Sequence, residues 1–103
     1  MDIEMQSGDR LFEWDENKNK KNLRKHGINF ETAVLVFEDE NRKEIYDWKH
    51  SRDEDRYKVI GMVEDILCVI YTERGDKTRI ISAREASSTD RRRYYGNSDI
   101  RFT

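Results

Sequence analysis

The sequence has no proline, one cysteine and five glycines in 103 residues. Because it lacks the proline- or glycine-rich tracts that mark a linker, we expect a flexible segment over residues 1–10 followed by one domain over residues 11–103. The lone Cys68 excludes an internal disulfide and a zinc site built from several cysteines. No run of about 18 apolar residues is present, which excludes a transmembrane helix. We therefore expect a soluble, cytoplasmic protein without a membrane partner.

Charged residues make up 41% of the chain and hydrophobic residues 35%, a balance that by itself leans toward disorder. The four Phe, five Tyr and two Trp residues argue for folding, because their side chains can build a small core. The net charge is −2, yet basic residues are concentrated in residues 18–25 and 74–93. A polyanion needs such a local positive surface and not a positive total, so the acidic balance does not exclude nucleic acid as a partner.

Hydrophobic spacing predicts strands and helices in the order β-α-α-β-β-β-β-α. The expected strands are residues 11–14, 43–48, 56–63, 66–73 and 78–84, and the expected helices are residues 16–26, 30–37 and 87–95. Asp15 is a typical N-cap, Gly27 a typical helix end, and Ser87 with Asp90 a capping box. This order predicts an α+β fold with an antiparallel sheet and with the helices packed on one face.

Two expected hairpins, turning at residues 64–65 and 75–76, give the strand register. This register leaves open a face that carries Arg56, Lys58, Tyr71, Glu73, Ser82 and Arg84 together with Ile60, Val69 and Ile80. It puts Arg56 directly opposite Glu73 and Lys58 opposite Tyr71, whereas Cys68 points into the apolar face that the helices should cover. A change of register by one residue would exchange the two faces of a strand.

The open face has the groups that metal-free RNA cleavage requires. The reaction needs a base for the 2′-hydroxyl proton, an acid for the leaving 5′ oxygen and fixed cations for the phosphate charge. Arginine suits the cationic role, because its planar guanidinium grips phosphate through two parallel hydrogen bonds. Glu73 is either the base or a residue that only holds Arg56 in an ordinary cross-strand ion pair. No cluster of side chains has metal-ligand spacing, so we expect neither a metal nor another cofactor.

Two histidines and two tryptophans are further candidates. His50 lies in the charged loop before Arg56, where it can act as an acid or a base. His26 is a weaker candidate, because a histidine at a helix end usually contacts the last helix carbonyls. Trp14 and Trp48 have rings that can stack on bases, but we expect both to pack in the core or at its rim.

Several blocks of the sequence together resemble the BrnT family of toxins. They are Phe12–Asp15, Lys25–Gly27, His50–Ser51, Arg56–Gly61, Arg79–Arg84 and Arg91–Tyr95. The resemblance implies a RelE-like α+β fold, RNA as the substrate and the toxin role in a type II toxin–antitoxin pair. It also implies a BrnA-like ribbon-helix-helix antitoxin as the partner, with operator DNA bound only through that antitoxin.

The resemblance also suggests site residues. In RelE-like toxins the arginine that ends the last strand and a tyrosine in the following helix belong to the RNA site. The matching positions are Arg84 and either Tyr94 or Tyr95, while Arg56 and Arg79 are similar to basic residues at the start of two strands. The predicted catalytic residues are therefore Arg56, Glu73, Arg79, Arg84 and Tyr94, and the predicted RNA-binding residues are Lys58, Tyr71, Ser82, His50, Arg91, Arg92 and Tyr95.

Taken together, residues and resemblance predict a metal-independent endoribonuclease that inhibits translation. The alternative is a non-catalytic module that binds the antitoxin and acts with it as a transcriptional co-repressor. The two functions differ in whether the purified chain shortens RNA by itself.

Overall fold

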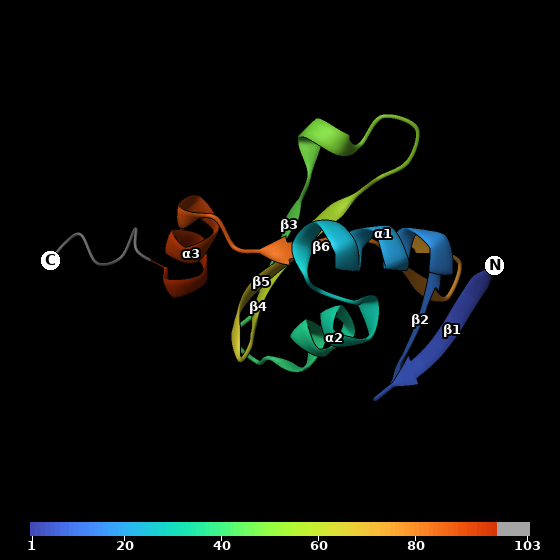
Figure 1. Cartoon of the computed structure of the whole chain (residues 1–103). Coiled ribbons are helices and arrows are strands. Elements are labelled where there is room, and N and C mark those ends of the chain that lie inside the picture. The colour runs from blue at the N-terminus through green and yellow to red at the C-terminus, as the bar shows by residue number, and fades with distance from the viewer. Residues whose placement is uncertain (97–103) are drawn as a thin grey trace, which may run out of the picture.

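The computed structural model describes residues 1–96, whose strands form one six-stranded sheet in the order β1-β2-β6-β5-β4-β3 (Figure 1). The strands are β1 (Asp2–Ser7), β2 (Arg10–Asp15), β3 (Lys43–Tyr46), β4 (Tyr57–Val63), β5 (Asp65–Arg74) and β6 (Lys77–Glu85). The helices are α1 (Glu16–His26), α2 (Phe30–Val34) and α3 (Ser88–Tyr95), with the short 3₁₀ helices η1 (Leu35–Glu38) and η2 (Trp48–His50). The predicted α+β class is confirmed. Residues 97–103 of the expected domain lie outside the described residues.

The N-terminal segment that we expected to be flexible contains a strand. β1 pairs antiparallel with β2, from Asp2 opposite Asp15 to Ser7 opposite Arg10, and Ile3 packs against the core. The hydrophobic pattern of this strand is weak, because its apolar residues alternate with polar residues that face solvent. The expectation of flexibility over residues 1–10 is therefore wrong.

The sheet is mixed and not wholly antiparallel, because β2 runs parallel to β6. These two strands pair over only three positions, at the start of β6. Farther along, Asn22 of α1 takes the place of β2: its side chain accepts from the Ala83 N–H at 3.1 Å and donates to the Ala83 carbonyl at 2.8 Å. Asn22 thus continues the ladder of hydrogen bonds and fixes α1 against β6.

The two longer helices have the predicted capping residues. Asp15 accepts a hydrogen bond of 2.9 Å from the Asn17 N–H at the start of α1. Gly27 ends α1 with a φ of 75°, in the left-handed region that favours glycine. At α3, Ser87 and Asp90 form the predicted capping box. These predictions succeeded because a cap depends on residues that are adjacent in the chain.

The main core lies between the sheet and α2. Its fully buried side chains include Trp14 from β2, Phe30 from α2 and Val69 from β5. The layer formed by α2 and η1 approaches β4 closely, since a Cβ placed on Gly61 would lie 3.0 Å from the Val36 carbonyl oxygen. The absent side chain of Gly61 lets the helical layer reach the sheet.

The third helix packs on the opposite face of the sheet, so the expectation that all helices share one face is wrong. Tyr94 of α3 forms a second, smaller cluster with Ile60, Ile66 and Cys68. Figure 1 shows α3 beyond one end of the sheet, away from α1 and α2. Because α3 covers only that end, much of the face remains open.

The register between β4 and β5 differs by one residue from the expected register. Val63 pairs with Asp65, because Glu64 alone turns the chain with a φ of 63°. We expected a two-residue turn here. The shift moves Tyr71 from the open face to the core face and moves Cys68 in the other direction.

A second irregularity, in β6, returns the end of that strand to the open face on which we expected it. The hairpin of β5 and β6 begins in the expected register, but Ile81 is an extra residue in a β-bulge. Beyond the bulge Arg84 lies opposite Cys68. The shift in β5 and the bulge in β6 cancel, so that Ser82 and Arg84 share the face of Lys58.

Candidate active site

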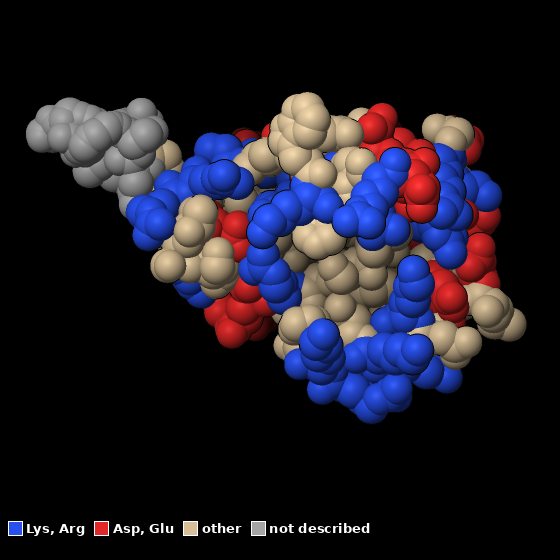
Figure 2. Space-filling view, turned by 90° about the horizontal axis from the view of Figure 1, so that it is seen from above, with Lys and Arg blue, Asp and Glu red and all other residues tan. Residues whose placement is uncertain are grey.

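The open face of the sheet forms a hollow with basic edges. The strand register places Lys58 from β4, Ile70 from β5, and Ser82 and Arg84 from β6 on this side of the sheet. Seen from above, the molecule has an uncharged floor that lysine and arginine side chains encircle (Figure 2). The surface that contains Lys58, Ser82 and Arg84 is termed the basic hollow below.

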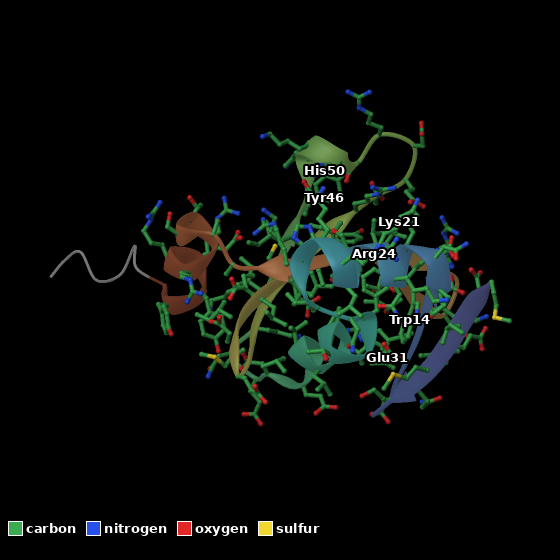
Figure 3. All side chains as sticks on the ribbon, in the orientation of Figure 1. Trp14, Lys21, Arg24, Glu31, Tyr46 and His50 are labelled. Carbon is green, nitrogen blue, oxygen red and sulfur yellow. The ribbon has the colours of Figure 1, made fainter. Side chains whose placement is uncertain are left out.

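Two elements that are far apart in the sequence flank the basic hollow. On one side lies α1, where Lys21 and Arg24 are three residues apart and share one face of the helix. On the other side lies the β3–β4 loop, residues 47–56, next to Tyr46 and including His50 (Figure 3). The open part of the sheet therefore lies between a helix and a loop.

A buried carboxylate holds two cations of the basic hollow. Asp90 is 2% exposed, accepts a hydrogen bond of 2.8 Å from the Arg84 guanidinium and lies 3.8 Å from the Lys58 ammonium. Burial alone would raise the pKa of Asp90, but hydrogen bonds from Ser87 and Arg84 outweigh it and keep the pKa below its ordinary value. Asp90 therefore stays ionised and holds Arg84 and Lys58 next to each other.

The thiol of Cys68 lies near both the Asp90 network and the β3–β4 loop. Burial raises the pKa of the Cys68 thiol to about 11, so the thiol stays protonated near neutral pH. The charged groups that act on it are Arg84, Asp90, Lys58 and Asp47. Because Asp47 belongs to the β3–β4 loop, the loop carries its charge close to the cations of the basic hollow.

The β3–β4 loop exposes a tryptophan beside these cations. Trp48 is 83% exposed, and its ring centroid lies 5.0 Å from that of Tyr46. Trp48 shares a pocket of about 330 Å³ with Lys58 from β4 and Arg93 from α3. The expected packing of Trp48 is wrong, whereas Trp14 is fully buried as expected. An exposed indole next to cations is suited to stack on a nucleic acid base.

His50 is held by a buried carboxylate of the same loop. Its Nδ1 lies 2.8 Å from Asp47 Oδ2, and the side chains of His50 and Asp47 are 61% and 7% exposed. Ser51 closes the loop independently, because its hydroxyl donates to the Asp47 carbonyl at 2.7 Å and accepts from the Arg56 N–H at 2.8 Å. The imidazole is thus fixed at one nitrogen and accessible at the other.

Arg56 lines a second pocket, of about 450 Å³, which it shares with His50 and Arg74. Its guanidinium lies 3.4 Å from Glu54. Within residues 1–96 its buried Nε has no hydrogen-bond partner, and an unsatisfied buried donor is costly. The expected pairing of Arg56 with Glu73 is wrong.

Two residues predicted for the site lie on the core face. Tyr71 is 3% exposed, stacks 5.5 Å from Tyr57 and donates a hydrogen bond of 2.7 Å to Glu44, and burial together with this bond raises the pKa of Tyr71. Glu73 lies 3.8 Å from Arg10 near the end of the hairpin. Both residues miss the basic hollow because β5 is shifted by one residue.

Arg79 lies at the opposite end of β6 from Arg84, five residues away and therefore roughly 15 Å along the strand. Two of its nitrogens donate to Asp2 at 3.2 Å, and Glu13 lies 3.2 Å away. Its side chain is only 13% exposed. Arg79 thus ties β1 and β2 to β6, and the structure does not bring it together with Arg84.

The two tyrosines of α3 differ in exposure. Tyr94 is 9% exposed, and its hydroxyl donates to Asp39 at 2.6 Å, which raises the pKa of Tyr94 to about 12. Asp39 also accepts from the Met62 N–H of β4 at 2.8 Å, so this contact anchors α3 to the sheet. Tyr95 is 59% exposed and is the accessible member of the pair.

The remaining basic candidates are spread over α3 and α1. Arg91 pairs with Asp65 at 3.1 Å, whereas Arg92 donates a hydrogen bond within its own helix. Arg93, which the prediction left out of the site, lines the pocket of about 330 Å³. His26 is the last residue of α1 and is exposed.

Sequence reasoning missed the two carboxylates that organise the site. Asp47 precedes His50 by three residues, a spacing that is visible in the sequence but common among loop residues. Asp90 was recognised only as part of a cap, because its contacts with Arg84 and Lys58 depend on how α3 folds back onto the sheet. Tertiary contacts alone reveal this second role.

Two kinds of feature are not found within residues 1–96. No group of three or more His, Cys, Asp or Glu side chains is arranged to hold a metal ion there. In the same residues no helix is long and apolar enough to cross a membrane.

Comparison with known proteins identifies the family. The family model described as "Ribonuclease toxin, BrnT, of type II toxin-antitoxin system" matches residues 14–90. The 1.1 Å crystal structure of the Brucella abortus ribonuclease toxin BrnT has a TM-score of 0.57 and 29% sequence identity, and the match covers 73% of this chain and 94% of that chain. No curated protein matches this chain significantly. The matched residues include both sides of the basic hollow, and the chain belongs to the BrnT family of type II toxin–antitoxin ribonuclease toxins.

Proposed function

We propose that this chain is a metal-independent endoribonuclease that cleaves cytoplasmic RNA in the basic hollow and thereby inhibits translation. The observation that carries the proposal is the ring of lysine and arginine around an open, uncharged floor (Figure 2). The family supplies the class of enzyme, and the hollow supplies a place where a polyanion fits a chain with a net charge of −2.

The cations of the basic hollow suit a phosphodiester in its transition state. Arg84 is 37% exposed and Lys58 is 22% exposed, so both can reach a ligand while Asp90 holds them. Cations that are fixed before the reaction stabilise the charge that develops on the phosphorus oxygens without reorganising. A guanidinium and an ammonium side by side thus supply the positive charge that a metal ion supplies in other nucleases.

The borders of the hollow suit a single strand of RNA. Trp48 offers an exposed ring on which a base can stack, at about 1–3 kcal/mol per stacked base. Arg93 lines the pocket beside it, and Lys21 and Arg24 on α1 lie on the opposite side. Stacking and phosphate contacts of this kind bind RNA with little dependence on sequence.

The antitoxin is proposed to act by covering this surface. A BrnA-like ribbon-helix-helix partner whose acidic segment lies over Arg84 and α3 would exclude RNA by direct competition, and operator DNA would be bound through the antitoxin's own domain. Because charge complementarity acts mainly on association, the association rate should fall as salt increases. Hydrogen exchange should show protection over residues 78–95 in the complex. Protection confined to α1 and β2 would rule out this form of neutralisation.

The central experiment incubates the purified chain with a labelled RNA oligonucleotide in EDTA. We expect cleavage that leaves 2′,3′-cyclic phosphate and 5′-hydroxyl ends, because the attacking group is the RNA's own 2′-hydroxyl. The matched control is a DNA oligonucleotide of the same sequence, which lacks that hydroxyl and should stay intact. Activity that EDTA abolishes and magnesium restores would contradict the metal-independent mechanism.

The same assay separates the enzyme from the alternative function. A chain that leaves RNA intact, yet increases operator binding by its antitoxin, would be a non-catalytic co-repressor. The open cationic face favours the ribonuclease, since a surface used only for antitoxin binding does not need two cations held on one buried carboxylate.

A further inference from the structure

The β3–β4 loop holds a histidine and a carboxylate in the arrangement of a proton-transfer pair. His50 Nδ1 lies 2.8 Å from Asp47 Oδ2. Because a carboxylate only accepts hydrogen bonds, the contact places the imidazole proton on Nδ1 and leaves the lone pair of Nε2 free. The side chain of His50 is 61% exposed, so Nε2 is accessible to a ligand.

The contact is not needed to close the loop. Ser51 already links the two ends, because its hydroxyl bonds to the Asp47 carbonyl and to the Arg56 N–H, and the Asp47 N–H donates to the Arg56 carbonyl at 2.9 Å. A merely local contact also gives no reason for the carboxylate of Asp47 to be buried. Its side chain is 7% exposed, and within residues 1–96 the His50 imidazole is the basic side chain that lies within salt-bridge distance of it. Burial of a carboxylate is costly, and positioning of an imidazole offers a functional reason for it.

The pair lies next to the cations that would hold the scissile phosphate. Asp47 lines one pocket together with Lys58 and Arg93, and His50 lines the neighbouring pocket together with Arg56. The charge of Asp47 also acts on the Cys68 thiol, as the charges of Lys58 and Arg84 do. His50 thus lines the pocket of Arg56, beside the pocket that Asp47 shares with Lys58 and Arg93.

We propose that His50 is the general base of RNA cleavage and that Asp47 is its positioning residue. This inference rests on the ribonuclease function proposed above. His50 Nε2 accepts the proton of the ribose 2′-hydroxyl, the 2′ oxygen attacks phosphorus, and the O2′–P bond forms while the P–O5′ bond breaks. The leaving 5′ oxygen takes a proton from water, and the hydroxide that remains recovers a proton from the His50 imidazolium. The products are a 2′,3′-cyclic phosphate and a 5′-hydroxyl end.

The test uses the full chain, a labelled RNA oligonucleotide and the variant His50→Ala. We expect a loss in kcat of about 10²- to 10⁴-fold, the range of general acid–base catalysis. The folded state should persist, because the imidazole is mostly exposed and Ser51 keeps the loop closed; a thermal melt checks this. Free imidazole should restore part of the rate, since it can accept the proton in place of the missing side chain.

Arg84→Ala provides the matched control. Both variants lose activity, but the lost group differs: free guanidinium should restore part of the rate of Arg84→Ala and should not restore His50→Ala. Free imidazole should do the reverse. This crossed rescue separates loss of a base from loss of a cation, which a general disturbance of the fold would not do.

The role of Asp47 is tested by Asp47→Asn alone and together with His50→Ala. The single variant should lower kcat with little change in KM, because the carboxylate touches the imidazole and not RNA. The double variant should be no slower than His50→Ala, since Asp47 acts only through His50. Additive losses would show instead that Asp47 supports the loop.

The outcomes distinguish failure of the ribonuclease function from failure of the role of His50. If the wild-type chain does not cleave RNA, the ribonuclease function fails and the role of His50 fails with it. If the wild-type chain cleaves and His50→Ala cleaves at the same rate, or its lost rate is not restored by imidazole, the general base is another group while the ribonuclease function stands.

Discussion

The two faces of the sheet are built in opposite ways. The face under α2 is closed by apolar side chains such as Trp14, Phe30 and Val69, all fully buried. The other face leaves Lys58 and Arg84 partly exposed and buries a carboxylate between them. One face therefore contributes to stability through removal of apolar surface from water, while the other keeps charges in fixed positions.

The open face costs the protein stability, because it buries a charged side chain where the other face buries apolar ones. Asp90 is buried at a desolvation cost, and hydrogen bonds from Ser87 and Arg84 offset that cost. Replacement of such a network by apolar residues often stabilises a protein. The proposed ribonuclease function gives a reason for the network, which would hold cations ready for a phosphate.

The largest expected effect is a loss of stability when the apolar face is disrupted. Trp14→Ala should lower the free energy of unfolding by about 3–5 kcal/mol, because Trp14 is fully buried against Phe30. Denaturant unfolding measures the change. Trp48→Ala is the matched control: this ring is 83% exposed, so stability should hardly change while RNA binding weakens. Equal destabilisation by the two variants would contradict the assignment of the two faces.

A smaller free-energy change is expected on the open face. Arg84→Ala should lose about 2–4 kcal/mol of transition-state stabilisation, comparable to removal of one oxyanion donor. Arg79→Ala should lose less, because Asp2 and Glu13 already engage that guanidinium. The ratio of kcat/KM values measures the difference. A greater loss at Arg79 would place the reaction at the other end of β6.

The contact between η1 and β4 gives the next effect. Gly61→Ala should destabilise the protein by about 1–3 kcal/mol, because the added Cβ would lie 3.0 Å from the Val36 carbonyl and 3.1 Å from its Cβ. Thermal unfolding measures the loss. The cleavage rate of the folded fraction should stay the same, since the contact lies on the face away from the basic hollow. A parallel fall in that rate would show that the faces are coupled.

The smallest effect should appear only in acid. The pKa of Asp90 is lowered in the folded state, so its contribution is fully present above its ordinary value of 3.8 and is lost as pH falls through the folded pKa. Asp90→Asn has no carboxylate to protonate at this position, so it should lack the part of the acid destabilisation that comes from Asp90. The free energy of unfolding is measured against pH for the wild-type chain and for Asp90→Asn. The difference between these two curves separates the contribution of Asp90 from that of the other carboxylates. Curves that stay parallel below pH 3.8 would contradict the ionised state of Asp90.

Local patterns predicted the secondary structure well and the site only in part. The caps at Asp15, Gly27 and Ser87 are correct because each depends on neighbours in the chain. β1 was missed because its alternating polar residues leave a weak hydrophobic signal. The roles given to the site residues stay predictions, although the structure brings Lys58 and Arg84 together.

Register accounts for the main errors in the site. The single-residue turn at Glu64 shifts β5 by one residue and sends Tyr71 into the core. The bulge at Ile81 compensates for the shift, so Arg84 reaches the expected face. Neither feature is visible in the hydrophobic pattern, because a strand that is apolar on both faces fits either register.

The sequence by itself determined the α+β class, the ends of α1 and α3 and the resemblance to BrnT toxins. These depend on residues close together in the chain and on short blocks of sequence. Only the tertiary structure decided that Asp90 holds Arg84 and Lys58 and that α3 lies on the open face. Such contacts join residues whose proximity follows from strand register, and register is set by packing of the whole sheet and not by any local pattern.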